Sequence, residues 1–300
     1  MAPIALFTYN RPEHTRRTLE TLAANPEAAR SQLIIFSDGP RPGDEAKVAE
    51  VRALLRERAW CGEIRIVESP VNRGLAASIV SGVTDLLREH DRLIVLEDDL
   101  ALSPGFLTYM NDALALYSEE PRVMSISGWL PEFRATLPET FFLRTTTSWG
   151  WATWRRAWEQ FHPDAAALAA RVEPRVKEFN VEGGYDYFRQ LRLNADGKLK
   201  TWAVLWYASI FLADGLTLHP NRSLVRNIGH DHSGTHSQPD ERFLHASLAS
   251  SIRVERIPIE PNATARAAFR KQLRGPLRVR LAETFRQLMK TVRRKVRLRR

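Results

Sequence analysis

The feature that most constrains this chain is a run of four apolar residues, 93–96, that leads directly into Glu97, Asp98 and Asp99. A short apolar run with polar flanks is typical of a strand buried in the middle of a sheet. Open α/β sheets bind ligands in the crevice beyond the carboxyl ends of their strands, so the three acids are expected at a ligand site. Adjacent carboxylates repel one another, and oxygen-rich sites suit Mg²⁺ or Mn²⁺. The alternative is a solvated acidic turn ahead of the helix start at residues 103–105.

Strand-like and helix-like segments alternate from the start of the chain up to this acidic run. We expect strands at residues 4–8, 33–36, 64–67 and 93–96, and helices at residues 16–24, 45–58 and 74–87. Turn-forming residues at 9–12 and 37–40 follow the first two strands. Such alternation predicts an α/β fold with a mostly parallel sheet and helices on both faces.

Tryptophan is concentrated in one part of the second half of the chain. Trp149, Trp151, Trp154 and Trp158 make up half of the eight tryptophans and fall within ten positions. They can form a core helix lined with aromatic rings. Alternatively, Trp149, Gly150 and Trp151 can form a sugar platform, because aromatic faces pack on apolar sugar surfaces and the indole N–H bonds hydroxyls. Around this cluster we expect helices at residues 106–117 and 202–212 and strands at 123–128 and 141–145.

Charge is distributed unevenly along the chain, whose formal net charge is +9. Residues 263–300 contain 14 Lys or Arg and one acid, and residues 1–262 contain 30 basic and 34 acidic residues. We therefore divide the chain into a domain, residues 1–262, and a basic tail, residues 263–300, whose charge indicates an anionic partner.

The basic tail has the pattern of an amphipathic helix. Pro276 is a favourable helix start, and the apolar positions recur at helical spacing: Leu277, Leu281, Phe285, Leu288, Val292 and Val296. Such a helix can dock on the domain, bind nucleic acid or lie on an anionic membrane. The domain has no nucleic-acid-binding motif, so nucleic acid is not expected, and we favour the membrane surface.

The cellular location is expected to be cytoplasmic, with possible peripheral attachment to the inner face of a membrane. Cys61 is the only cysteine, which excludes an internal disulfide and favours a reducing compartment. The sequence shows no signal-peptide pattern at its start and no apolar run long enough to span a bilayer.

Three histidines and one aspartate lie together at residues 230–236. They can form a transition-metal site, although cysteine is absent and the spacing fits neither a strand nor a helix. We favour a Gly/Ser-containing loop that closes on a diphosphate, with His230 touching the metal.

Taken together, these motifs resemble the GT-A fold glycosyltransferases, and most closely a bacterial family related to the N-acetylglucosaminyltransferase I type. The resemblance rests on these segments: the first strand and loop at 7–12, Ser37-Asp38, Asn72-Arg73-Gly74-Leu75, Glu97-Asp98-Asp99, Trp149-Gly150-Trp151 and residues 220–229. It covers about residues 3–240. It implies a Rossmann-like sheet with a nucleotide-binding half, residues 1–128, and an acceptor-binding half, residues 129–262.

The resemblance also implies roles for single residues. Glu97 would face the donor sugar, Asp98 the ribose and Asp99 the metal, while Asp38 would bond the uracil or ribose. Further donor contacts would come from Thr8, Asn10, Arg11, Asn72 and Arg73, and Arg73 can pair with phosphate oxygens.

The catalytic base departs from the family pattern. Relatives often carry Trp-Asp at the position of Trp202, which is followed here by Ala203. The candidates to replace that acid are Asp231, Asp186 and Glu182. We favour Asp231 slightly, because its loop contains glycine and can close over the site.

The implied reaction is metal-dependent transfer of a sugar, with inversion, from a nucleoside diphosphate to a hydroxyl of a glycan or lipid-linked acceptor. UDP follows from the resemblance alone. Two alternatives come from other classes. A nucleotidyltransferase shares the α/β layout, but residues 8–13 lack the glycine-rich loop it usually carries. A catalytically inactive sugar-nucleotide-binding module would explain Ala203 but not the intact acidic run.

Overall fold

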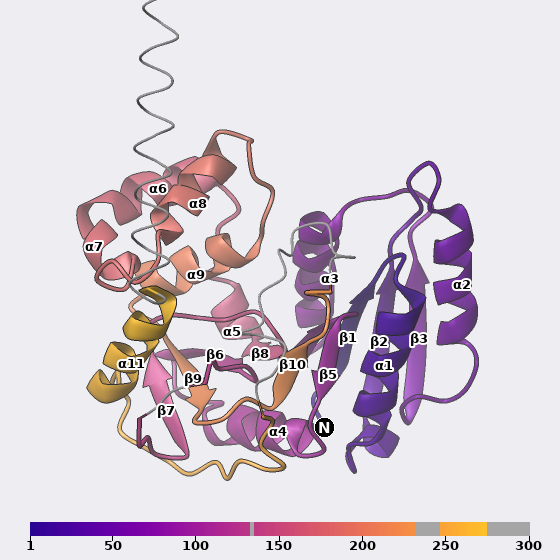
Figure 1. The fold of residues 1–300 in the computed structure, drawn as a ribbon, viewed down its shortest axis with the longest axis horizontal. Coiled ribbons are helices and arrows are strands. Elements are labelled where there is room, and N and C mark those ends of the chain that lie inside the picture. The colour runs from indigo at the N-terminus through magenta and orange to yellow at the C-terminus, as the bar shows by residue number, and fades with distance from the viewer. Residues whose placement is uncertain (133–134, 232–246, 275–300) are drawn as a thin grey trace, which may run out of the picture.

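The computed structural model of the chain describes residues 1–132, 135–231 and 247–274, which form a central sheet with helices on both faces (Figure 1). The strands are β1 (Ile4–Thr8), β2 (Gln32–Ser37), β3 (Glu63–Glu68), β4 (Arg92–Glu97), β5 (Leu100–Leu102), β6 (Val123–Ser127), β7 (Thr140–Leu143), β8 (Trp151–Trp154), β9 (Leu216–Pro220) and β10 (Val225–Asn227). The helices are α1 (Pro12–Ala23), α2 (Glu45–Leu55), α3 (Leu75–Glu89), α4 (Phe106–Leu116), α5 (Arg155–Trp158), α6 (Ala165–Val172), α7 (Val176–Phe179), α8 (Tyr187–Ala195), α9 (Ala203–Leu212) and α11 (Ala263–Arg274), with 3₁₀ turns η1 (Ala28–Arg30) and η2 (Glu173–Arg175).

The predicted alternation of strands and helices up to β4 is confirmed. One difference is that α1 begins at Pro12 rather than at residue 16. Proline is tolerated at this first helical position because its missing N–H would have no intrahelical partner there.

The central sheet has eight strands in the order β3-β2-β1-β4-β8-β6-β9-β7. The first four are parallel, with Thr8 beside Ser37 and Phe7 beside Glu97. Their carboxyl ends therefore meet at one edge, which brings together the loops that follow β1, β2 and β4. Strand β8 runs antiparallel to both β4 and β6, and β7 runs antiparallel to β9, so the sheet as a whole is mixed.

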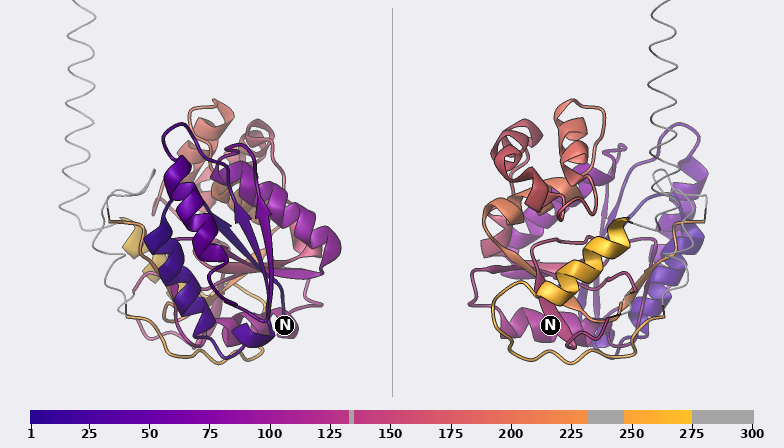
Figure 2. Two further views of the ribbon diagram at one scale, coloured as in Figure 1. Left: turned by 90° about the vertical axis from the view of Figure 1, so that its right-hand side faces the viewer. Right: turned by 60° about the vertical axis from the view of Figure 1, so that its left-hand side comes forward.

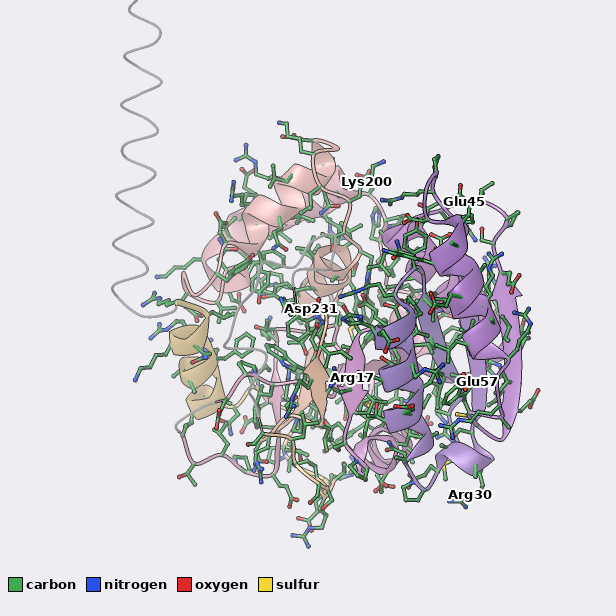
Figure 3. The ribbon with its side chains drawn as sticks, turned by 45° about the vertical axis from the view of Figure 1, so that its right-hand side comes forward. Arg17, Arg30, Glu45, Glu57, Lys200 and Asp231 are labelled. Carbon is green, nitrogen blue, oxygen red and sulfur yellow. The ribbon has the colours of Figure 1, made fainter. Side chains whose placement is uncertain are left out.

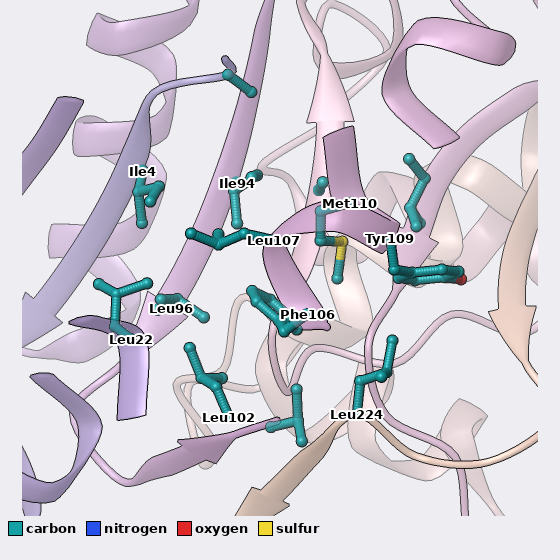
Figure 4. Packing of buried hydrophobic residues seen from close by; sticks show 14 of the residues in the cluster. Ile4, Leu22, Ile94, Leu96, Leu102, Phe106, Leu107, Tyr109, Met110 and Leu224 are labelled. Carbon is teal, nitrogen blue, oxygen red and sulfur yellow. The ribbon is translucent and has the colours of Figure 1, made fainter. Parts of the chain in front are cut away.

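Strands β1, β2 and β4 are buried on both faces, which explains their nearly continuous apolar sequence, whereas β3 is an exposed edge strand. Ile4 and Leu6 of β1 pack into one apolar cluster with residues of α1, α2 and α4, as Figure 4 shows around Phe106 and Met110. Ala5 and Phe7 face the other side and pack with residues of α3, α5 and α9. Each fully buried aliphatic side chain of this kind stabilises the fold by roughly 1.5–3 kcal/mol. The acidic strand β4 is thus fixed within the sheet, between β1 and β8.

The tryptophan-rich segment forms a strand rather than the core helix considered above. Residues 151–154 are the buried strand β8, which bonds to β4 on one side and β6 on the other, and only α5 beyond it is helical. Trp151 and Trp154 lie on opposite faces, because side chains alternate along a strand. Trp154 donates its indole N–H to Leu114 O over 3.1 Å.

The first part of the basic tail belongs to the packed fold. Ala265 and Phe269 of α11 are buried with Phe141 and Leu143 of β7 and with Val181, and Figure 2 shows α11 lying across this side of the molecule. The predicted limit after residue 262 therefore differs from the structure, in which α11 completes a small core. The apolar stripe that begins at Leu277 lies outside the described residues, and no helix in the described part of the chain is long and apolar enough to cross a membrane.

Candidate active site

The three acids lie where the sheet rule places them, at the carboxyl end of β4. Glu97 is the last residue of the strand, and Asp98 and Asp99 form the turn that leads into β5. All three side chains are partly buried behind the fully buried residues 93–96. Strand β10, far along the chain, pairs antiparallel with β5, so the residues just after β10 return to this turn.

The environment of these carboxylates disfavours their charged forms. Burial, together with repulsion from Asp99 and Asp98, raises the pKa of Glu97 well above its usual range. Burial also raises the pKa of Asp98 to about 7, with a further contribution from Asp99. The pKa of Asp99 is raised by burial too, although the guanidinium of Arg11 opposes that shift. A cation beside these carboxylates would favour their charged forms and lower their pKa values, so the site suits a bound cation.

The loop after β1 supplies the groups nearest to these acids. The backbone N–H of Tyr9 donates to Asp98 Oδ2 over 3.1 Å. Arg11 Nη1 donates to Asp99 Oδ2 over 3.1 Å, in a pair whose side chains are 16% and 19% exposed. The structure therefore brings together Arg11, Asp98 and Asp99, which were predicted from separate segments.

The segment after β10 closes the same cluster from the other side. Ile228 N–H donates to Asp99 O over 2.8 Å. Arg11 Nη2 donates to Gly229 O over 3.2 Å and to Asp231 Oδ1 over 3.3 Å. Figure 3 shows Asp231 between the two halves of the molecule, near the end of β10. Of the predicted bases, Asp231 is the one that the structure places beside Arg11.

His14 was not predicted and joins this cluster from the first turn of α1. Its Nε2 lies 3.0 Å from Asp231 Oδ2 and 3.1 Å from Arg11 Nη2. Because arginine only donates, Nε2 can bond one of these neighbours at a time. No signal in the sequence indicated this contact, because the helix was expected only from residue 16, whereas α1 begins at Pro12 and Arg11 is its N-cap.

Asp38 occupies the loop after β2, as predicted, but its carboxylate is used by the protein itself. It accepts hydrogen bonds from four groups: Gly39 N at 2.9 Å, Arg73 N at 2.9 Å, Gly74 N at 2.8 Å and Asn72 Nδ2 at 3.2 Å. A carboxylate has about four acceptor positions, so these donors fill it. Asp38 thus ties the loop after β2 to the loop before α3, and a uracil or ribose that bonded it would have to displace one of the four.

The other residues predicted to bind the sugar donor lie at the same edge of the sheet, and they differ in how many of their polar groups are already bonded to the protein. Thr8 is buried and donates its hydroxyl to Phe36 O over 3.4 Å. Asn10 Nδ2 donates to Asp44 Oδ1 over 2.9 Å, and Asp44 also accepts from Tyr9 Oη over 2.7 Å. In contrast, the side chain of Arg73 is exposed and makes no hydrogen bond or ion pair with the described residues.

The predicted sugar platform separates into three different environments. Trp149 is partly exposed, and its ring lies 4.6 Å from that of Trp129 and 5.4 Å from that of His230. Gly150 has a positive φ of 62°, and a Cβ there would lie 2.8 Å from Val225 Cγ2, so glycine is needed for backbone shape and space.

The expectation that Trp151 belongs to the platform is wrong. Trp151 is 1% exposed, and its ring lies 5.2 Å from that of Trp202 inside the core. Trp151 is the first residue of β8, and its side chain points to the face of the sheet that α9 covers, so it is shielded from solvent. Trp129, which no motif in the sequence indicates, is the ring that accompanies Trp149.

The two remaining candidates for the base have structural partners. Asp186 is the N-cap of α8, where its Oδ1 accepts from Arg189 N over 3.1 Å and from Asn180 Nδ2 over 3.0 Å. Glu182 pairs with Arg266 of α11 at 3.3 Å. Within the described part of the chain, neither side chain forms a hydrogen bond or ion pair with Arg11, Asp98 or Asp99.

A transition-metal site of histidine and aspartate receives no support from the described part of the chain. No group of three or more His, Cys, Asp or Glu side chains there is arranged to hold a metal ion. His230 faces the ring of Trp149. The other two histidines of the predicted cluster, His232 and His236, lie outside the described residues.

Comparison with known proteins supports the interpretation of this edge of the sheet. Residues 4–130 match the family described as glycosyl transferase family 2. A curated relative, the alpha-1,3-mannosyl-glycoprotein 2-beta-N-acetylglucosaminyltransferase of Arabidopsis thaliana, is 21% identical over 175 residues, which are 54% of this chain and 39% of the relative. The chain thus covers well under half of that relative's length.

Solved structures with a similar arrangement include two glycosyltransferases. The mannosyltransferase PcManGT from Pyrobaculum calidifontis, in complex with GDP-Man and Mn²⁺, is 12% identical with a TM-score of 0.40, over 71% of this chain and 70% of that one. Mouse xyloside xylosyltransferase 1 is 14% identical with a TM-score of 0.39, over 70% and 80% of the two chains. Because these structural similarities are low, only the sequence match of residues 4–130 identifies a family. Residues 4–130 thus match a glycosyl transferase family 2 domain, the family of GT-A fold that the motifs of this part of the chain resemble.

Proposed function

We propose that this protein is a glycosyltransferase that moves a sugar from a nucleoside diphosphate, UDP by preference, to a hydroxyl of a glycan or lipid-linked acceptor, with inversion at the anomeric carbon. The observation that carries the proposal is the placement of Asp98 and Asp99 at the end of β4, in contact with the loop after β1. Both elements belong to the family 2 domain. The family also favours glycosyl transfer over nucleotidyl transfer and over a binding module without activity.

The donor set at the end of β4 fits a magnesium or manganese ion. Mg²⁺ typically takes one or two protein carboxylates and completes its shell with substrate phosphates and water, so three protein ligands are not required. Asp99 is the carboxylate we assign to it, and its raised pKa reflects the cost of a buried charge that a cation would offset. When bound, the ion would neutralise charge on the departing diphosphate.

The diphosphate itself is assigned to two arginines of the chain. Arg73 has an exposed guanidinium just before α3, and its backbone N–H is held by Asp38 over 2.9 Å. Arg11 lies at the acidic strand end. A planar guanidinium can bond two phosphate oxygens at once, which orients the donor as well as attracting it.

Asp231 is our choice for the base that removes the acceptor proton. Its side chain is 45% exposed, so an acceptor hydroxyl can reach it, and it adjoins Arg11, which contacts Asp99. Asp186 in its capping position stays the competing candidate. The ring of Trp149, with Trp129 beside it, is assigned to sugar binding, because aromatic faces pack on apolar sugar surfaces.

The basic residues beyond α11 are assigned to an anionic membrane surface, which would suit a lipid-linked acceptor on its cytoplasmic face. The support is their composition: residues 275–300 contain ten Lys or Arg and one acid. A basic amphipathic helix binds anionic lipid through both its charge and its apolar stripe.

A donor screen tests the proposed function directly. Thermal denaturation is measured with each of a set of nucleoside diphosphates and their sugars, with and without Mn²⁺, and product analysis follows for any donor that stabilises the protein. Stabilisation by UDP compounds that requires Mn²⁺, together with sugar transfer, is expected. Stabilisation by another nucleotide would correct the donor, and release of pyrophosphate from a nucleoside triphosphate would favour the nucleotidyltransferase.

A further inference from the structure

One guanidinium connects the acidic strand end to the segment that covers it. Arg11 bonds Asp99 through Nη1, and through Nη2 it bonds Gly229 O and Asp231 Oδ1. Its side chain is only 16% exposed. Arg11 therefore lies between the acid assigned to the cation and the acid assigned to the base, and it contacts both.

The segment from Ile228 to Asp231 is packed closely onto this guanidinium. A Cβ at Gly229 would lie 2.2 Å from Asp99 Oδ2 and 2.8 Å from Arg11 Nη1. Residue 229 thus has to be glycine for the segment to lie this low over the acids. The residue before Ile228 holds the start of the segment in place, because Asn227 pairs with Leu100 in the antiparallel β5–β10 ribbon.

Arg11 and Gly229 lie at the same carboxylate oxygen of Asp99. The same Oδ2 atom that faces Gly229 accepts the hydrogen bond from Arg11 Nη1. Oδ2 is already bonded by a guanidinium and covered by the backbone at Gly229, so a divalent ion that binds this oxygen competes with Arg11 for space and for charge.

We propose that Arg11 acts as a latch, which means that it bonds Asp99 where the cation would bind and at the same time holds residues 228–231 over the site. A divalent cation that binds Asp99 displaces Arg11. Residues 228–231, with Asp231, are then released. This inference rests on the cation site proposed at Asp99. Arg11 is a positioning residue in this scheme. After displacement, the guanidinium of Arg11 can bond the donor diphosphate, and this new contact offsets the loss of its contact with Asp99.

The geometry explains why the latch is an arginine. Its planar fork reaches Asp99 from one nitrogen and Gly229 and Asp231 from the other, whereas a lysine ammonium is a single point charge. Arg11→Lys is therefore expected to keep the charge beside Asp99 and lose the fastening of residues 228–231.

The first test measures the binding of Mn²⁺ alone, without nucleotide, by electron paramagnetic resonance. Arg11→Met should bind Mn²⁺ about tenfold more tightly than wild type, which corresponds to about 1.4 kcal/mol. Arg16→Met is the matched control, because Arg16 lies on the same helix but pairs with Glu57 on the surface at 2.9 Å. It should bind Mn²⁺ as wild type does.

The second test distinguishes a latch from simple charge repulsion between Arg11 and the ion. Hydrogen exchange is measured by mass spectrometry on peptides that cover residues 224–231. In wild type, Mn²⁺ alone should raise exchange there severalfold. Arg11→Met and Arg11→Lys should exchange fast without Mn²⁺ and respond little to it. Gly229→Ala, which keeps Arg11 but forces the segment off Asp99, should also exchange fast.

The outcomes separate the latch from the site on which it rests. If Asp99→Asn leaves Mn²⁺ binding unchanged, the cation site at Asp99 is wrong and the latch with it. If Asp99→Asn removes Mn²⁺ binding while wild-type exchange at 224–231 does not respond to Mn²⁺, the cation site stands and the latch is overturned. The wild-type exchange measurement decides the matter even if the Arg11 variants fold poorly.

Discussion

His14 Nε2 and Asp231 Oδ2 lie 3.0 Å apart, although one belongs to the first turn of α1 and the other follows β10. This contact orients the Asp231 carboxylate toward the acidic end of β4, on the side of Arg11. The carboxylate of Asp186, in contrast, is oriented by the N-terminus of α8. The two candidates for the catalytic base are therefore held by different parts of the fold, which makes them separable by mutation.

Asp231→Asn is expected to preserve donor binding and to lower turnover by ~10²–10⁴-fold, the usual contribution of a positioned general base. The amide keeps the shape of the side chain but cannot accept the proton. Turnover and donor affinity are measured separately, by product formation and by calorimetry. Asp186→Asn is the paired variant, and it should lower the stability of α8 slightly while turnover stays near wild type. A large loss of turnover in Asp186→Asn alone would transfer the role to that residue.

Asp99→Ala is expected to abolish sugar transfer and Mn²⁺-dependent binding of UDP, with the fold intact. The side chain is partly exposed and its backbone carbonyl, which accepts from Ile228 N at 2.8 Å, stays in place. Circular dichroism checks the fold, and calorimetry with UDP in the presence and absence of Mn²⁺ checks the binding. Turnover near the wild-type rate would show that the end of β4 is not the cation site.

Much of the fold of residues 1–128 could be predicted from the sequence, because local patterns determine it. Short apolar runs fix strands, and the parallel sheet then carries Asp38 and the acids after β4 to one edge. Contacts between segments that are distant in the sequence could not be predicted from these local patterns. The four donors to Asp38 and the burial of Trp151 depend on which segments pack together, and no periodicity in the sequence specifies that. Helix α11 is as basic as residues 275–300, so composition assigned it to the tail. Its packing depends instead on its apolar side chains, chiefly Ala265 and Phe269, which are buried against β7.

Asp38→Ala is expected to destabilise the protein by roughly 3 kcal/mol, because four donors lose their acceptor at a buried position. Urea denaturation measures the loss. Asp164→Ala is the control: Asp164 also accepts two backbone N–H groups, from Ala166 and Ala167, but at an exposed helix start, where water can replace it. It should cost clearly less. Equal losses in the two variants would mean that the bonds to Asp38 contribute no more than an ordinary helix cap.

His219 is expected to make the protein sensitive to mild acid. It is fully buried on β9, its Nε2 lies 2.9 Å from Thr145 O, and burial lowers its pKa from 6.5 to about 4. Between these values the unfolded chain binds a proton that the folded protein does not. Stability is therefore complete above pH 6.5 and falls as the pH decreases toward 4, by up to about 3 kcal/mol.

The variant His219→Gln can still donate to Thr145 O and does not titrate in this range. Urea denaturation at several pH values between 7 and 4 should show a shallower loss of stability for this variant than for wild type. His162→Gln, at an exposed histidine, should follow wild type. If His219→Gln keeps the full wild-type slope, the acid sensitivity comes from other groups.

The proposed membrane attachment is tested with a truncation after residue 274 rather than after residue 262. Removing α11 would expose Phe141 and Val181, which pack against Phe269, and a misfolded protein can bind lipid nonspecifically. The 1–274 chain keeps that core and loses ten basic residues and one acid. Each Lys or Arg near an anionic surface contributes roughly 1 kcal/mol, weakened by salt. In flotation with liposomes, the full chain should float only with anionic lipid and less at high salt, while 1–274 should stay at the bottom of the gradient. Equal behaviour of the two chains would rule out the attachment, and flotation of the full chain with neutral liposomes would show that charge is not its cause.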